Sequence, residues 1–256
     1  MALPTIDVAD FLLIVVGIFT GFINTVAGGG SIITLPVLIL YFGLPPVLAN
    51  GTNRVGILVQ TLASAWGFHQ QKVSPFVFGV KKSLFLGVAI SLGALIGARF
   101  AIQIPEGIFN KILSVAMLVV LFFTFYKPKT TRIKQLSIQK AYLLTALAFF
   151  LIGIYAGFIQ AGTGLLLIIT LSVLQNLSLL QANALKTIIV FMFTIGTVSV
   201  FAYHGQINFW YGILLAIGNA LGGLLASRIS VKKGDGFIRV FMAVSVFLMA
   251  FKLWFL

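Results

Sequence analysis

The chain has 256 residues, of which 60% are hydrophobic and 8% are charged, and its mean hydropathy is +1.14. Ordinary soluble domains carry about 25% charged residues, so this composition excludes a soluble globular protein and indicates an integral membrane protein. The 17 Lys and Arg residues against 4 Asp and Glu give a formal net charge of +13. Cytoplasmic loops of membrane proteins collect Lys and Arg, so this charge does not indicate a nucleic-acid partner.

Apolar segments follow one another along the whole chain, and we expect an all-α polytopic membrane protein. The first set is predicted at 9–26, 31–43, 48–70, 76–101 and 106–126, and the second at 140–159, 164–175, 180–203, 208–229 and 236–255. A helix needs about 20 residues to cross the hydrocarbon core, so the second segment of each set is short for a crossing. These segments, 31–43 and 164–175, are either re-entrant, or cross on a slant, or continue the crossing of the segment before them.

The two sets are copies of one repeat. Short stretches of the first set recur in the same order in the second: 21–24 as 157–160, 27–30 as 161–164, 49–50 as 182–183, and 92–100 as 221–229. Internal repeats of this kind are typical of membrane transporters. We therefore predict a first membrane repeat at 1–126, a basic cytoplasmic connecting loop at 127–139 and a second membrane repeat at 140–256.

Loop charges indicate how the repeats are oriented. Matched loops lie on opposite faces of the membrane if the repeats are inverted, and Lys and Arg mark the cytoplasmic face. The connection between the third and fourth segments holds Lys72, Lys81 and Lys82 in the first repeat and no Lys or Arg in the second, whereas the next connection is basic in the second repeat, with Lys232 and Lys233. The sequence therefore predicts two inverted five-segment repeats, with re-entrant or broken helices at the Gly-rich stretches and both termini outside.

The Gly-rich stretches AGGGS (27–31) and AGTG (161–164) interrupt apolar sequence at matching places. A helix break that faces lipid leaves backbone groups unsatisfied, so we expect both breaks to face protein or a watery cavity. Half-helix N-termini at such breaks can attract an anionic substrate. Close helix packing is the alternative, and it is the expected role of Gly93 with Gly97 and of Gly218 with Gly222. The predicted substrate-binding residues at the breaks are Gly28, Gly29, Gly30, Ser31, Gly162, Thr163 and Gly164.

The third segment of each repeat begins with polar residues in apolar surroundings. Buried charge in a membrane is costly and marks a functional site, although Arg54 and Lys186 can also extend to the membrane interface. We predict that these starts complete a cationic pocket with Asn50, Thr52, Asn53, Arg54, Asn183 and Lys186. All four acidic residues lie near predicted segment ends, so a cation transporter is disfavoured and a small anionic substrate is favoured.

Catalytic and cofactor motifs are missing from the sequence. It contains no HExxH, GxSxG, GxGxxG or Walker pattern and no cysteine, so we predict no enzymatic activity, no cofactor and no metal site. His69 and His204 stand at equivalent places near segment ends. We interpret them as interfacial residues, with coupling of a proton as the alternative.

The stretches GFINTVAGGGSIITLP (21–36), ANGTNR (49–54) and LGALIGAR (92–99), with their degenerate second copy, resemble the TauE/SafE family of sulfite exporters, also called the toluene-sulfonate uptake permease family. The resemblance implies a secondary transporter of small sulfur-containing oxoanions, such as sulfite or an organosulfonate, in a bacterial inner (plasma) membrane. It also implies two inverted halves whose first two segments are re-entrant. An alternating-access transporter explains the inverted repeat, the paired breaks, the cationic pocket and the missing carboxylates together. An anion channel and a transporter of a non-sulfur small organic anion are the alternatives. Membrane lipid is an expected partner, and a coupling proton or ion and a homodimer are left open.

Overall fold

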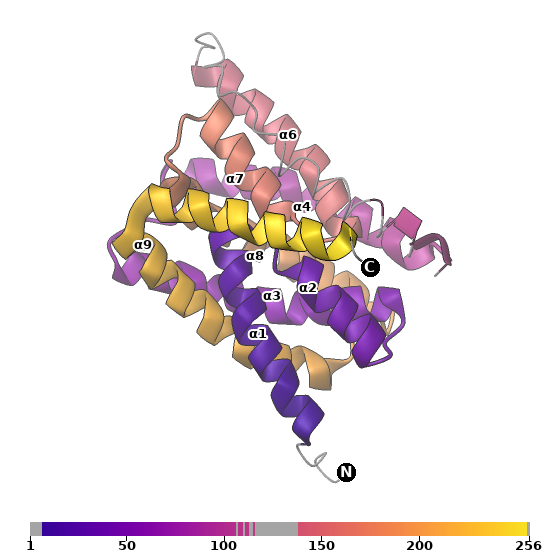
Figure 1. Cartoon of the computed structure of the whole chain (residues 1–256). Coiled ribbons are helices and arrows are strands. Elements are labelled where there is room, and N and C mark those ends of the chain that lie inside the picture. Colours follow the sequence, from indigo (N-terminus) through magenta and orange to yellow (C-terminus); the bar gives the residue numbers. More distant parts are fainter. Residues whose placement is uncertain (1–6, 106, 110, 113–114, 116–137, 255–256) are drawn as a thin grey trace.

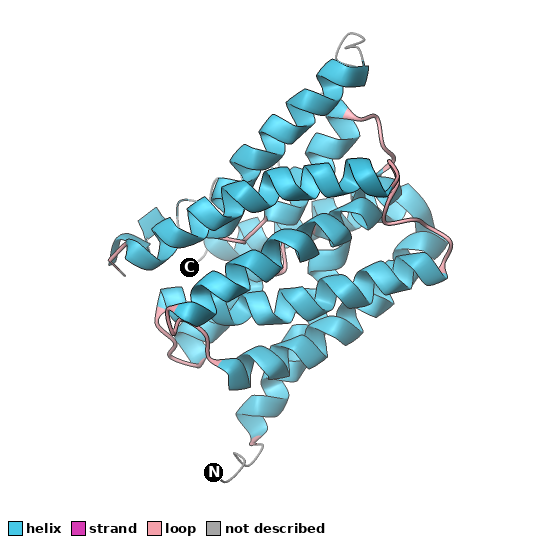
Figure 2. Cartoon of the chain, turned by 180° about the vertical axis from the view of Figure 1, so that it is seen from behind, coloured by secondary structure: helices cyan, strands magenta, loops and turns pink. Residues whose placement is uncertain are grey.

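The computed structural model describes residues 7–105, 107–109, 111–112, 115 and 138–254, and these form helices and loops with no strand among them (Figure 2). The helices of the first half are α1 (Val8–Ala27), α2 (Ser31–Pro36), the π-helix η1 (Val37–Tyr41), α3 (Pro46–Gln70) and α4 (Val80–Gln103). Those of the second half are α6 (Ile138–Phe158), α7 (Thr163–Leu174), α8 (Leu179–Tyr203) and α9 (Phe209–Trp254).

The observed helices follow the predicted segments closely. Helices α1, α3, α6, α7 and α8 differ from the predicted bounds by two residues at most. Helix α4 starts four residues later than predicted, at Val80 instead of 76, because Gly79 adopts a left-handed φ of +80° directly before it. The predicted segments 208–229 and 236–255 are joined in α9, with Gly234 (φ +69°, ψ −168°) as a non-helical residue between them. The predicted segment 106–126 and the connecting loop 127–139 lie mostly outside the described residues.

Five described helices are long and apolar enough to cross a membrane. They are α1, α4, α6 from Gln139, α8, and the part of α9 from Phe209 to Gly234. Two shorter apolar helices, Ser31–Tyr41 and Thr163–Leu174, match the two short segments that the sequence predicts. The prediction of an all-helical, multi-pass architecture is therefore confirmed.

Local sequence explains where several helices begin and end. Asp7 caps the N-terminus of α1. Its side chain accepts a 2.8 Å hydrogen bond from the Asp10 amide, and the Asp10 side chain accepts one from the Asp7 amide. Ser178 and Gln181 form the same capping box at the start of α8. The other end of α1 is set by Gly28, whose left-handed backbone stops the helix.

Each half places its first helix against the fourth helix of the other half: α1 packs along α9, and α6 packs along α4 (Figure 1). Glycines make these contacts close. A methyl group on Gly93 or Gly97 would overlap the backbone of α6, and one on Gly218 or Gly222 would overlap the backbone of α1. The predicted packing role of both GxxxG pairs is confirmed.

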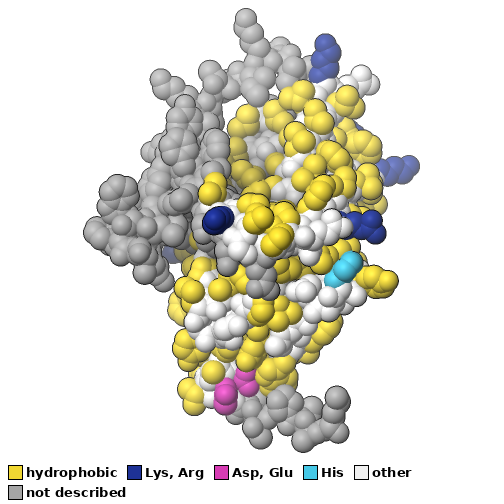
Figure 3. Space-filling view, turned by 90° about the vertical axis from the view of Figure 1, so that its right-hand side faces the viewer, with side chains coloured by type: hydrophobic (Ala, Val, Ile, Leu, Met, Phe, Trp, Pro, Cys, Tyr) yellow, Lys and Arg dark blue, Asp and Glu magenta, His cyan; other side chains and the backbone are white. Residues whose placement is uncertain are grey.

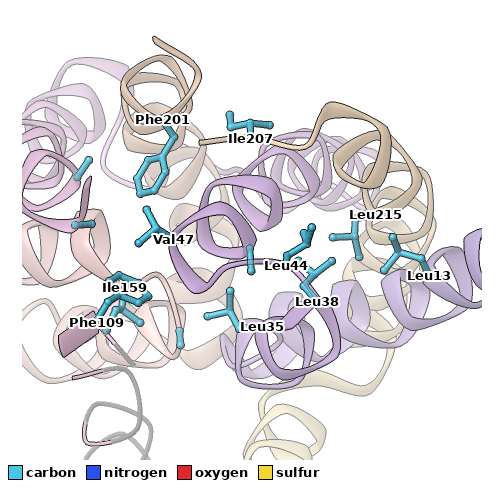
Figure 4. Packing of buried hydrophobic residues seen from close by; sticks show 14 of the residues in the cluster. Leu13, Leu35, Leu38, Leu44, Val47, Phe109, Ile159, Phe201, Ile207 and Leu215 are labelled. Atoms are coloured by element: carbon cyan, nitrogen blue, oxygen red, sulfur yellow. The ribbon is translucent and has the colours of Figure 1, made fainter. Parts of the chain in front are cut away.

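Helices α3 and α8 contact each other, and each also packs against the fourth helix of the other half. Both carry buried polar residues along much of their length, which Leu-rich lipid-facing helices do not. Apolar side chains surround them: one cluster joins Leu13 of α1, Leu38 of η1, Val47 of α3, Phe201 of α8 and Leu215 of α9 (Figure 4). The polar centre is thus enclosed by apolar packing.

The end of α7 lies beside the start of α6. The Gln175 carboxamide, directly after α7, donates a 3.0 Å bond to the Ala141 carbonyl and a 2.7 Å bond to the Thr145 hydroxyl. Both acceptors lie in the first part of α6, so α7 runs back along the helix that precedes it. In the first half, Leu38 of η1 and Leu13 near the start of α1 belong to one core cluster.

Charged side chains are distributed unevenly over the described surface. In Figure 3, acidic side chains lie at the lower end, and Lys and Arg side chains lie above them, towards the opposite end. Many large apolar side chains are exposed, and those of α4 include Leu84, Val88 and Leu92. This arrangement is typical of a protein whose apolar belt faces lipid.

Candidate functional site

The two Gly-rich breaks meet at the centre of the molecule. Gly28 (φ +79°) ends α1, and Gly162 (φ +72°) stands directly before α7, so both breaks use a left-handed glycine at the matching position. A methyl group on Gly28 would overlap the backbone of Gly164 and Leu165. One on Gly164 would lie 2.5 Å from the Gly28 Cα. The two breaks are therefore in direct backbone contact, with no side chain between them.

Asparagines from α3 and α8 bind the ends of the broken helices reciprocally. The Asn50 Nδ2 donates to the Phe158 carbonyl at the end of α6, at 2.8 Å, and the Asn183 Nδ2 donates to the Val26 carbonyl at the end of α1, at 3.2 Å. Terminal carbonyls of a helix have no partner within the helix, so these bonds satisfy groups that the breaks expose. Each half thereby supports the break of the other half.

Two buried cations occupy the same helix ends. The Lys186 Nζ donates to the Asn24 and Thr25 carbonyls of α1, at 3.0 and 2.8 Å. The Arg54 Nη2 donates to the Gly157 carbonyl of α6 at 2.6 Å, and its guanidinium lies 4.6 Å from the centre of the Phe201 ring. The C-terminal end of a helix carries partial negative charge, which both cations offset. Arg54 is fully buried and Lys186 is 4% exposed, so both side chains end inside the protein and not at its surface.

A small cavity lies beside the meeting point of the breaks. The first half lines it with Asn24, Thr25, Ile57, Gln60 and Thr61. The second half lines it with Gln160, Thr163, Gly164, Lys186, Thr187 and Val190. Its volume of about 20 Å³ corresponds to room for about one water molecule. Among the described lining residues, Lys186 is the charged one and none is Asp or Glu, so the cavity has a net positive lining.

A hydrogen-bond network forms the first-half wall of this cavity. The Asn24 Nδ2 donates to the Gln60 Oε1 at 2.9 Å, and the Gln60 Nε2 donates to the Thr25 Oγ1 at 3.0 Å. Thr25 also bonds the Ser64 hydroxyl at 2.8 Å. These bonds join α1 to α3 and leave both polar atoms of the Gln60 carboxamide paired.

The structure brings only some of the predicted site residues together. Thr163, Gly164 and Lys186 line the cavity, Gly28 contacts Gly164, and Gly162 stands at the turn into α7. The Leu165 amide donates to the Gly162 carbonyl at 3.1 Å, within the turn.

The other predicted residues lie around the cavity lining without being part of it. The Asn53 Nδ2 donates to the Ser31 Oγ at 3.0 Å, which ties α3 to the start of α2. The Thr52 hydroxyl accepts a 2.9 Å bond from the Asn208 amide before α9. The remaining predicted residues hold helix ends or turns: Asn50, Asn183 and Arg54 bind terminal carbonyls, and the Gly29 and Gly30 carbonyls accept bonds from Ile32 and Ile33.

Sequence reasoning missed the cavity-lining residues Asn24, Thr25, Gln60 and Gln160. A signal for two of them exists, because Asn24 and Gln160 occupy the same position of the repeat and are both carboxamides. Gln60 stands among apolar residues in the middle of the third segment, where a polar residue is rare without a role. His69 and His204 are exposed at the ends of α3 and α8, which agrees with their interpretation as interfacial residues.

Comparison with known proteins gives consistent results. Residues 13–253 match the family model described as "Sulfite exporter TauE/SafE". A "Probable membrane transporter protein" of Haemophilus influenzae is 28% identical over 246 residues, covering 94% of this chain and 93% of the relative. "Probable membrane transporter protein ORF9" of a Sinorhizobium species is 26% identical, covering 94% and 90%, and "YfcA" of Escherichia coli K12 is 23% identical, covering 94% and 88%. No solved structure matches the chain.

Proposed function

Because the chain belongs to the sulfite exporter TauE/SafE family of multi-pass membrane transporters, we propose that it is a secondary transporter of a small sulfur-containing oxoanion, such as sulfite or an organosulfonate, and that it works by alternating access. The family description is the support for sulfur. The bacterial origin of the relatives supports an inner-membrane location. The residues that line the cavity where the two helix breaks meet independently support a negatively charged substrate.

The observation that carries the proposal is the buried ammonium group of Lys186 in the cavity where the breaks meet. A charge buried within a membrane protein is costly unless a partner compensates it. Among the described residues that line the cavity no carboxylate compensates Lys186, whose bonds go to neutral carbonyls. A small anion would complete this environment, and nearby hydroxyl and carboxamide groups can bind its oxygens.

We further propose that the halves are inverted repeats and that α1 with α2 and η1, and α6 with α7, are re-entrant pairs. The bonds from Gln175 to the start of α6 support a reversal of direction in the second half. The shared core cluster of Leu13 and Leu38 supports a similar reversal in the first. The reciprocal bonds of Asn50 and Asn183 support a pseudo-twofold relation between the halves.

Lys186 connects substrate binding to movement in this mechanism. An ammonium group has three N–H donors, and two of them bind the Asn24 and Thr25 carbonyls in this conformation. A cavity of about 20 Å³ is too small for an oxoanion, so the end of α1 must move away from α8 before an anion enters. The anion then accepts bonds from Lys186 in place of the carbonyls. Rotation of one half against the other, about the side-chain-free contact of Gly28 and Gly164, exposes the anion to either side in turn.

Counterflow of radiolabelled sulfite into liposomes that contain the purified chain tests this function. A transporter that alternates between two states gives saturable uptake, and unlabelled sulfite inside the liposomes accelerates the entry of labelled sulfite. Methanesulfonate, isethionate and acetate as competitors separate a sulfur oxoanion from a general organic anion. Flux that neither saturates nor responds to sulfite on the opposite side would indicate an anion channel instead. Exchange of a cation without exchange of any anion would contradict the proposal.

A further inference from the structure

The two halves differ in the polar groups that they contribute at matching positions. Position by position, the second half has Gln160, Thr163 and Lys186 where the first has Asn24, Gly29 and Asn53. At these three positions, the second half therefore has a longer carboxamide, a hydroxyl and a cation. The first half has two shorter carboxamides there, and a glycine without a side chain. All three second-half residues line the cavity, and of the three first-half residues Asn24 does.

The second-half groups also keep unused hydrogen-bonding capacity. The Thr163 hydroxyl is buried, with 2% of the residue exposed, and has no hydrogen-bond partner within the described part of the chain. The Gln160 Oε1, in a residue that is 4% exposed, likewise has none there. Buried polar groups are normally paired, so two unpaired groups beside the same cavity point to a ligand.

Gln160 can present either end of its carboxamide to that ligand. Its Nε2 donates to the Thr194 hydroxyl at 3.0 Å. A hydroxyl can donate as well as accept, so half a turn of the carboxamide lets Thr194 donate to the Oε1 and directs the Nε2 into the cavity. In that orientation the N–H groups of Gln160 can bind an oxygen of an anion.

The other hydroxyls of the cavity are already engaged. The Thr187 Oγ1 donates to the Ala184 carbonyl at 2.7 Å, and the Thr61 Oγ1 donates to the Leu58 carbonyl at 2.9 Å. In the first half, Asn24 donates to Gln60, and Asn53 donates to Ser31. Among the described residues that line the cavity, the buried side-chain atoms without a partner thus belong to the second half: the Thr163 hydroxyl and the Gln160 Oε1. Lys186, also of the second half, keeps a third N–H beyond its two bonds to carbonyls.

We infer that the second half alone holds the anion, through the side chains of Thr163, Gln160 and Lys186, while the first half supplies the closing wall of the cavity. This inference rests on the proposed function. Three donors on separate side chains suit an oxoanion, whose oxygens point in different directions, better than a halide, which is a single atom. When the halves rotate, the anion stays with residues 160–164 and α8, and the end of α1 moves relative to it.

Equilibrium binding of sulfite to the purified full chain, measured by isothermal titration calorimetry, tests the inference. Removing one charge-assisted donor should weaken binding by about tenfold or more in Thr163→Val and in Gln160→Met. Thr163→Ser keeps the hydroxyl and should bind within about threefold of the wild type. Thr187→Val is the matched control, because it removes a hydroxyl from the same cavity that is already bonded to Ala184. It should leave the affinity unchanged, and chloride should compete poorly.

The outcomes separate this inference from the function on which it rests. One outcome is that the wild type binds sulfite and that both variants, Thr163→Val and Gln160→Met, bind it with the same affinity. In that case the inference is wrong and the proposed function stands. The same holds if Thr187→Val loses as much affinity as Thr163→Val. If the wild type binds no oxoanion, the proposed function fails and the inference fails with it. Thr163→Ala replaces Thr163→Val if the valine variant does not fold.

Discussion

A methyl group at Gly28 tests the contact between the two helix breaks. In Gly28→Ala the new residue must keep a φ of +79°, which costs an L-residue about 1–2 kcal/mol. The methyl group also overlaps the backbone of Gly164 and Leu165, which belongs to the other half and cannot rotate away as a side chain can. Forcing extra atoms into a packed site costs about 1–3 kcal/mol more. We therefore expect Gly28→Ala to destabilise the protein by about 2–5 kcal/mol.

Gly43 provides the matched control for this prediction. It also has a left-handed backbone, with φ +66°, but a methyl group there would meet no atom within 4 Å. Gly43→Ala should therefore lower the stability only by the cost of the left-handed backbone, about 1–2 kcal/mol. Unfolding of the three proteins in mixed detergent micelles, followed by circular dichroism, measures the difference. Equal stability of the two variants would refute the direct contact between the breaks.

Three further substitutions test other contacts. Gly157→Ala should destabilise by about 1–3 kcal/mol because its methyl group would overlap the Ala94 carbonyl of α4; an unchanged melting temperature would argue against this packing. Arg54→Gln should lower the stability of the protein by about 2–5 kcal/mol, because the charged hydrogen bond to Gly157 and the contact with the Phe201 ring are lost. It should leave the affinity for sulfite within about threefold of the wild type. A large loss of affinity would place Arg54 in the binding site. Gln175→Leu should speed hydrogen exchange in α7 because two bonds to α6 are lost; unchanged exchange would contradict that docking.

The helices were predictable because their signals are local. Apolar runs set the membrane segments, the left-handed glycines at 28 and 162 end one run and begin the next, and capping residues such as Asp7 fix the helix starts. The break within α9 follows a local signal too, because the non-helical Gly234 lies between the last two predicted segments, 208–229 and 236–255. A single glycine between two apolar runs is compatible with either a loop or a kink.

The arrangement of the site was less accessible to sequence reasoning. Arg54 and Lys186 look equivalent as buried cations, but Lys186 lines the cavity whereas Arg54 lies against Gly157 and Phe201. That difference depends on how α3 and α8 rotate when they pack, which a sequence pattern does not encode. Gln60 was overlooked because its partners, Asn24 and Thr25, are more than thirty residues away in the sequence. Contacts between distant segments decide which polar residues meet.

The central claim is that the buried ammonium of Lys186 binds the transported anion. Its most direct test is sulfite binding by wild type, Lys186→Gln and Lys81→Gln, measured by calorimetry on purified full-length protein. Lys81 is an exposed lysine at the start of α4, so its variant removes the same charge away from the cavity. We predict wild-type affinity for Lys81→Gln and at least about tenfold weaker binding for Lys186→Gln, since truncating one member of a buried charge pair costs about 2–5 kcal/mol. Wild-type affinity in Lys186→Gln would contradict the claim.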